Sequence, residues 1–142
     1  MEIQPETPGL IAVAGLALAL DLDDFDGVIR YLHPDVVYEI GGATHRGAAA
    51  VVESYRSGSA AAREIFDHVE FDHTILGPVG DRTIRVDFSD RLTADGEFFE
   101  HHSIQDITVD LTDRVTHIVD RHVEGQRSRL DEFMSRHQRV RP

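Results

Sequence analysis

Charged side chains at alternate positions of a strand-like segment are the first candidates for chemistry. Arg85 and Asp87 are two residues apart, so both point to the same side of a strand. The opposite side carries the apolar residues Ile84, Val86 and Phe88. If the polar side faces a cavity, an arginine can keep one carboxylate ionised while the pKa of another is raised, which suits acid–base catalysis. If the apolar side faces inward, the charged residues form an exposed ladder worth at most about 1 kcal/mol.

Two later segments also place polar residues at alternate positions. The residues that share a face are His101, Ser103, Gln105 and Ile107 in the first segment and Ile118, Asp120 and His122 in the second. Asp120 and His122 therefore point together toward a cavity or together toward solvent. His102 points away from His101, so this adjacent pair is not a joint metal ligand.

The residue types present exclude several chemistries. The 142 residues include no cysteine, which excludes disulfides and thiolate nucleophiles. All fourteen basic residues are arginines, which excludes Schiff-base chemistry on lysine. The nine histidines form no helical ligand pair supported by an acid, so we predict no metal site and no organic cofactor.

The charge and the hydrophobic pattern limit the partners. A formal net charge of −12 repels nucleic acids and anionic membrane surfaces, so we expect a small-molecule partner instead. The apolar run from Leu10 to Leu20 is too short to cross a bilayer and lacks the positive flank of a signal peptide. We interpret it as a buried helix of a cytoplasmic protein.

Hydrophobic periodicity predicts the elements that position these residues. Helices are expected from Pro8 to about Leu20, from Asp23 to about Leu32, from Gly47 to about Ala62 with a bend at Gly58, and around Leu130 to His137. Strands are expected at 35–40, near 44–45, and at 68–76, 82–92, 97–111 and 114–123, the last four as an antiparallel meander. This order predicts a single α+β domain over residues 1–142, with a curved sheet wrapped around the helices and one pocket.

Three short motifs agree with this order of elements. They are Asp-Phe-Asp-Gly at 24–27, Pro-Asp-Val-Val-Tyr-Glu at 34–39 and His-Arg-Gly-Ala at 45–48. With the element order, they resemble the nuclear transport factor 2-like superfamily, in particular its SnoaL-like polyketide cyclases, limonene epoxide hydrolases and ketosteroid isomerases. The resemblance covers nearly the whole chain and implies a cone-shaped, cystatin-like α+β barrel. Such motifs mark a fold and say little about the chemistry.

The resemblance to limonene epoxide hydrolases implies a catalytic trio. In that family an arginine bridges two aspartates, one of which activates water while the other protonates the epoxide. Here Asp120 would be the base, Arg85 the bridge and Asp87 the acid. Tyr38 matches the water-binding tyrosine of that family, whereas Ile40 replaces its asparagine. The superfamily's pocket side implies further substrate contacts at His101, Ser103, Gln105, Ile118 and His122.

Other relatives imply other chemistries. Ketosteroid isomerase is a poorer match, because its catalytic aspartates fall at Ile40 and Gln105. In polyketide cyclases a final-strand aspartate works with a nearby histidine, and Asp120 with His101 or His122 would fill those roles.

A dehydratase branch of the superfamily uses an Asp–His dyad. Asp21 and His68 would supply it, although Asp21 and Asp23 are also candidates to cap the second helix.

We therefore expect a cofactor-independent acid–base enzyme that closes a ring or opens an epoxide on a small apolar, polyketide-like or terpenoid-like substrate. The alternatives are a non-catalytic ligand-binding or dimerisation domain of the same fold, and a dehydratase or isomerase. A homodimer through the outer sheet face is expected if that face carries Ile84, Val86 and Phe88, because such patches are unusual on monomers. Periodicity does not determine the pocket shape, so the substrate stays open.

Overall fold

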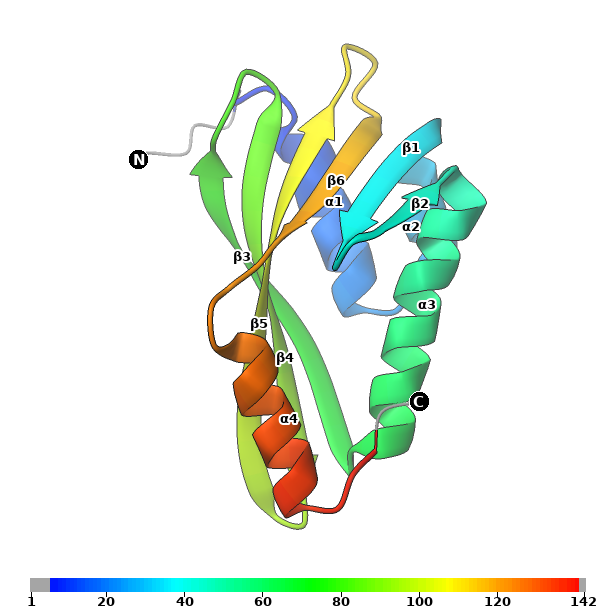
Figure 1. Ribbon diagram of the computed structural model, residues 1–142. Helices are drawn as coiled ribbons and strands as arrows, with labels where there is room; N and C mark the ends of the chain where they lie inside the picture. Colours follow the sequence, from blue (N-terminus) through cyan, green and yellow to red (C-terminus); the bar gives the residue numbers. More distant parts are fainter. Residues whose placement is uncertain (1–5, 141–142) are drawn as a thin grey trace.

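The computed structural model describes residues 6–140 as four helices and six strands (Figure 1). The helices are α1 (Leu10–Asp21), α2 (Phe25–Tyr31), α3 (Ala48–Ile65) and α4 (Gln126–Arg136). The strands are β1 (Leu32–Ile40), β2 (Ala43–Arg46), β3 (His68–Pro78), β4 (Thr83–Ala94), β5 (Glu97–Val109) and β6 (Val115–Arg121). None of the helices in this part of the chain combines the length and the apolar character that a bilayer span needs.

The six strands form one twisted sheet in the order β2-β1-β6-β5-β4-β3. The long strands β3, β4 and β5 run side by side along the molecule, and β1 and β2 extend the sheet toward α3 (Figure 1). The expected antiparallel meander of β3 to β6 is confirmed. Because β1 pairs with β6 in parallel, the sheet as a whole is mixed. The α+β architecture is confirmed, with the sheet open between its two edge strands.

The main core lies between α1 and one face of the sheet, which we call the inner face. Helix α1 is apolar at nearly every position, and its Val13 and Leu16 are fully buried. Across from it, Ile84 and Val86 of β4 and Ile107 of β5 are buried in the same cluster. Burying each of these side chains stabilises the fold by about 2 kcal/mol. This free energy determines which face of β4 points inward.

A second cluster covers the inner face at the far end of the long strands. Phe133 and Met134 of α4 pack there against Phe66, Leu92 and Ala94. Leu92 and Ala94 continue the inward alternation of β4, since they lie an even number of residues from Ile84 and Val86. The part of β4 between the two clusters is left to face the space between α1, α3 and the sheet.

The opposite, outer face of the sheet is polar. Asp106 of β5 has a side chain only 5% exposed, and it accepts two hydrogen bonds from Arg85, at 2.7 and 3.0 Å. Arg121 of β6 donates a third at 2.8 Å. These hydrogen bonds and charges, with Arg85 first, hold the pKa of Asp106 below its usual range.

Some predicted boundaries differ from the observed ones. Helix α3 continues through Gly58 without a break, because its residues 51 and 52 anchor it in the core and the solvated Gly58 has open space around it. Strand β1 begins at Leu32 and contains Pro34, which lies where the pairing with β6 shifts register and so needs no N–H. Asp24, and neither Asp21 nor Asp23, caps α2 by accepting a hydrogen bond from the Gly27 N–H.

We predict that Asp106→Asn destabilises the fold. Asparagine cannot accept the same charge-assisted hydrogen bonds from both arginines, so the free energy of unfolding at pH 7 should fall by about 2 kcal/mol. The folded pKa of Asp106 is lowered, so its contribution is present above about pH 4 and is lost as the pH falls through the folded value. The difference between the two proteins should therefore shrink in acid.

Urea denaturation followed by circular dichroism at pH 7 and at pH 3 measures both effects. Asp81→Asn, at an exposed aspartate, is the matched control and should change stability little. Equal stability of wild type and Asp106→Asn at pH 7 would contradict the proposed role of this cluster.

Candidate active site

A cavity of about 260 Å³ lies between the inner face of the sheet and the helices. Its walls come from the end of α1, from α2 and α3, and from all strands except β2. Its aromatic lining residues are Phe25, Tyr38, Tyr55, Phe71 and Phe88. Its acidic lining residues are Asp21, Asp23, Asp72, Asp90 and Asp120. The cavity therefore combines an apolar wall with several carboxyl groups.

A chain of hydrogen bonds crosses the floor of the cavity. The Tyr55 hydroxyl donates to Gln105 Oε1 at 2.9 Å, and Gln105 Nε2 donates to the Tyr38 hydroxyl at 2.9 Å. The Tyr38 and Tyr55 rings stack, with centroids 5.0 Å apart. Asp120 lies directly opposite Gln105 in the β5–β6 register, and Gln105 Nε2 is 3.5 Å from Asp120 Oδ2. The four side chains thus form one polar group inside an apolar pocket.

Burial sets the protonation of this group. It raises the pKa of Tyr38 and of Tyr55, so both remain neutral hydroxyls that can donate hydrogen bonds. Burial also raises the pKa of Asp120, against smaller lowering effects from Gln105 and His122. Asp120 forms no ion pair within the described residues, so its carboxylate is a stronger base than an exposed aspartate.

Asp90 is a second carboxyl group inside the cavity. It lies on β4 between Phe71 of β3 and His101 of β5 in the strand register. Burial raises the pKa of Asp90 to about 7, with a smaller raising effect from Asp21 and a lowering effect from His102. No hydrogen bond or ion pair reaches Asp90 in residues 6–140. A carboxyl group that is half protonated near neutral pH is unusual outside functional sites.

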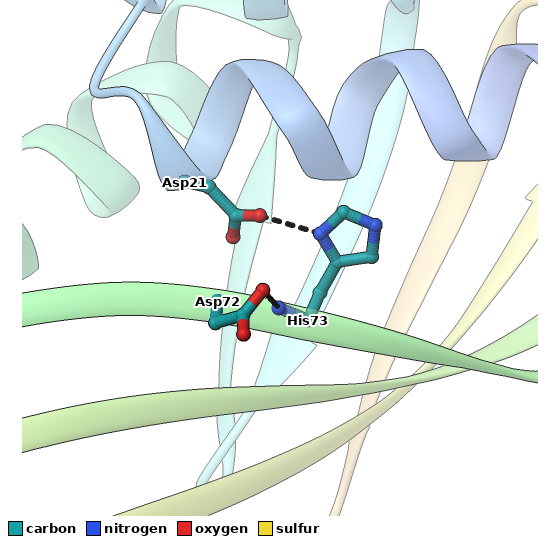
Figure 2. A group of neighbouring side chains, drawn as sticks. All are labelled: Asp21, Asp72 and His73. Atoms are coloured by element: carbon teal, nitrogen blue, oxygen red, sulfur yellow. Dashed lines mark hydrogen bonds and ion pairs between the residues drawn. The ribbon is translucent and has the colours of Figure 1, made fainter.

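Asp21, at the end of α1, is paired with a histidine of β3 (Figure 2). His73 Nδ1 and Asp21 Oδ2 are 2.5 Å apart, and Asp72 accepts a hydrogen bond from the His73 backbone N–H. Burial raises the pKa of Asp21, and its Oδ1 atom is buried without a hydrogen-bond partner. Asp21 and Asp72 line the cavity, whereas His73 does not.

These three residues are also the group in the described part of the chain whose donor atoms lie close enough to surround a metal ion, within 4.8 Å of one another. The Asp21 oxygen and the His73 nitrogen already share a hydrogen bond, so the group does not present two free ligand atoms.

Five of the residues predicted to form the site line the cavity, and they are Tyr38, Ile40, Ser103, Gln105 and Asp120. The other five predicted residues do not line it, and they are Arg85, Asp87, His101, Ile118 and His122. Ile118 is buried in the main core beneath the floor, and His101 is on the inner face with its Nδ1 buried and without a partner. His122 is exposed, because β6 ends at Arg121.

The expected trio of Arg85, Asp87 and Asp120 is not assembled. Arg85 binds Asp106 on the outer face, and Asp87 pairs there with His102 at 2.9 Å. The placement of Arg85 and Asp87 in the pocket was therefore wrong. The reason is the burial of Ile84 and Val86 under α1, which turns the charged positions of β4 outward. The apolar residues 84, 86 and 88 are thus not on the outer face and form no apolar patch there, and the homodimer stays a prediction.

Asp90 of β4 has an inward-facing carboxyl group and was not among the predicted site residues. It continues the same alternation as Ile84, Val86 and Phe88, so the signal was an apolar strand face that ends in a carboxyl group. The Asp21–His68 dyad, considered as an alternative, is not formed. His68 is exposed and contacts Glu70, and His73 takes its place.

Comparison with known proteins defines the fold. No family profile and no curated protein matches this sequence. Among solved structures, the chain is similar to a putative SnoaL-like polyketide cyclase from Shewanella denitrificans, with a TM-score of 0.68, 16% identity, and coverage of 93% of this chain and 99% of that one. It is similar to an LEH-like epoxide hydrolase from Mycobacterium tuberculosis, with a TM-score of 0.63, 21% identity, and coverage of 92% and 91%. It is also similar to an NTF2-like protein from Exiguobacterium sp. 255-15, with a TM-score of 0.63, 12% identity, and coverage of 80% and 98%. The chain therefore has the nuclear transport factor 2-like fold.

We predict that Asp90→Asn stabilises the protein in alkaline solution. The folded protein keeps the Asp90 proton up to about pH 7, whereas an unfolded aspartate loses it near pH 4. The favourable contribution is therefore full below about pH 4 and declines as the pH rises toward 7, by at most about 4 kcal/mol. Asparagine carries no charge, so the free energy of unfolding should rise by about 2 kcal/mol at pH 8 and change little at pH 4.

Urea denaturation at the two pH values measures this difference. Asp87→Asn, on the outer side of the same strand, is the control and should show no gain at pH 8. The prediction fails if Asp90→Asn is no more stable than wild type at pH 8.

Proposed function

We propose that this protein is a cofactor-independent acid–base enzyme that closes a ring on a small, largely apolar carbonyl compound. The observation that supports this most is Asp120, a carboxyl group on the floor of an apolar cavity that forms no ion pair within the described residues and lies next to a hydroxyl held in place by Gln105. The similarity in fold to a putative SnoaL-like polyketide cyclase agrees with it.

The geometry supports enolisation as the first step. The Asp120 carboxylate removes a proton from the carbon next to a carbonyl group and becomes a carboxylic acid. The Tyr38 hydroxyl accepts its hydrogen bond from Gln105, so its own proton is free to stabilise the negative oxygen of the enolate. Tyr55 fixes the amide of Gln105 in this orientation by donating to Oε1.

Ring closure follows within the same substrate. The enolate carbon attacks a second carbonyl carbon, a C–C bond forms, and the resulting alkoxide takes the proton back from Asp120. The step is balanced without an external acid, oxidant or metal. The aromatic wall excludes water and favours a folded substrate over an extended one.

Epoxide opening is less favoured as the reaction. It would need the arginine that bridges two aspartates in limonene epoxide hydrolases, and the inward position before Asp90 on β4 is Phe88. The dehydratase alternative needs a histidine that faces the substrate, and His73 does not line the cavity. A non-catalytic binding role would be favoured by a cavity without converging polar groups, whereas Asp120, Gln105 and Tyr38 converge here.

We predict that Asp120→Asn abolishes proton transfer. In D₂O the wild-type protein should exchange the α-hydrogens of an aryl-substituted ketone such as 4-phenyl-2-butanone, followed by mass spectrometry. The variant should exchange about 10²- to 10⁴-fold more slowly. Because burial raises the pKa of Asp120, the wild-type rate should rise with pH through a midpoint above the usual value of about 4.

The control for this experiment is Asp87→Asn, which changes the same residue type on the outer face and should retain the wild-type rate. Full exchange by Asp120→Asn would contradict the assignment of the base. Binding of ketones and of epoxides without exchange or turnover in the wild type would favour the non-catalytic alternative.

We predict that Tyr38→Phe slows the exchange without moving its pH midpoint by much. The variant keeps the aromatic ring and loses the hydrogen bond to the enolate oxygen, which is worth about 10²-fold in rate. The same D₂O assay, run over a pH series, measures both quantities. A rate equal to wild type would remove Tyr38 from the mechanism.

A further inference from the structure

We infer that the substrate carries a positive charge, as an apolar amine whose ammonium group binds between Asp21 and Asp90. This inference deepens the proposed function, because it concerns the same cavity and names the class of molecule that enters it. It rests on three features of the cavity: the carboxyl groups that line it, the carboxyl oxygens that lack hydrogen-bond donors, and the aromatic rings beside them.

The cavity lining carries charge of one sign only. Five aspartates line it, and none of its lining residues in the described part of the chain is an arginine, a lysine or a histidine. Two of the aspartates have arginine partners, since Asp23 binds Arg63 at 2.9 Å and Asp72 lies 3.5 Å from Arg91, and Asp21 pairs with His73. An anionic substrate would meet a lining of carboxyl groups, and the two arginines nearby are already paired with carboxylates, so it would be repelled.

Two carboxyl groups in the cavity lack the donors that their oxygens need. Asp21 has a side chain only 10% exposed, and its Oδ1 is buried without a partner while Oδ2 contacts His73. Asp90 has no hydrogen bond or ion pair within residues 6–140. Ionised carboxylates are acceptors only, and a carboxylate oxygen left without a donor away from bulk water is costly. A ligand ammonium group supplies up to three donors and the missing charge at once.

Aromatic rings stand beside these carboxyl groups. Phe71 is the neighbour of Asp90 across the β3–β4 register, and Phe88 lies two residues before it on the same face of β4. The faces of such rings attract ammonium groups by roughly 0.5 to 2 kcal/mol. Arg63 stacks on Phe71 at 5.2 Å and is held by Asp23, so it does not pair with Asp90.

The strand register separates the charged end of the substrate from its reacting end. Asp90 lies opposite His101, and Asp120 lies opposite Gln105, four residues further along β5. Four residues of a strand span roughly 13 Å. The expected substrate class is therefore an apolar ketone whose amine is separated from the reacting carbon by a chain or ring system on the order of 10 Å long.

Isothermal titration calorimetry at pH 8 with three matched probes tests the inference. The probes are 3-phenylpropylamine, 3-phenylpropan-1-ol and 3-phenylpropanoate, which share one apolar body and differ in charge. The wild-type protein should bind the amine about tenfold or more tightly than the alcohol, and should not bind the carboxylate detectably. In Asp90→Asn the preference for the amine over the alcohol should disappear, whereas the outer-face control Asp87→Asn should retain it.

The inference is overturned if the amine does not bind at millimolar concentration, if the alcohol or the carboxylate binds as tightly as the amine, or if Asp90→Asn keeps the full preference. The binding measurement is independent of turnover. Asp120→Asn should still prefer the amine, so a variant that loses catalysis but keeps this preference supports the inference. If the wild type exchanges neutral ketones but shows no preference for the amine, only the proposed function is supported.

Discussion

The direction in which β4 turns its apolar side chains determines the chemistry of the cavity. Ile84 and Val86 are buried against α1, and exposing both to water would cost several kcal/mol. A strand alternates with period two, so this one constraint sends Arg85 to the outer face and Asp90 to the inner one. The cavity therefore contains the Asp90 carboxyl group with no arginine beside it in the lining. On the outer face, Arg85 pairs with the Asp106 carboxylate.

Asp90 and Asp106 show how strongly the two faces differ. Both are aspartates on adjacent strands of one sheet, Asp106 on the outer face and Asp90 on the inner face. Asp106 accepts hydrogen bonds from Arg85 and Arg121, which lower its pKa and make it part of the support of the fold. Asp90 has no such partner, and burial raises its pKa to about 7. The first arrangement stabilises the folded chain, whereas the second weakens it at neutral pH and leaves a group ready to bind a ligand.

The sequence predicted the helices and strands well, but it did not determine which side of each strand points toward the core. The long strands were predicted within about two residues of their ends, because alternation over ten or more positions is a strong signal. Tyr38, Gln105 and Asp120 were predicted in the pocket, and they line it. The face of β4 was not determined, because either side of that strand is a plausible core side until the position of α1 is known. The pairing of Asp21 with His73 depends on the same helix placement, and no local pattern encodes a contact across 52 residues.

The residue at position 105 links the fold to the proposed chemistry. Its amide has one acceptor and one donor group, so it can accept from Tyr55 and donate to Tyr38 at the same time. A carboxylate there could accept from both tyrosines but would add another negative charge beside Asp120 and would turn the Tyr38 proton away from the substrate. An apolar residue would leave both hydroxyls unsatisfied in a buried place. Glutamine keeps Tyr38 as a donor toward the cavity, while Asp120, which forms no ion pair in the described residues, can act as the base.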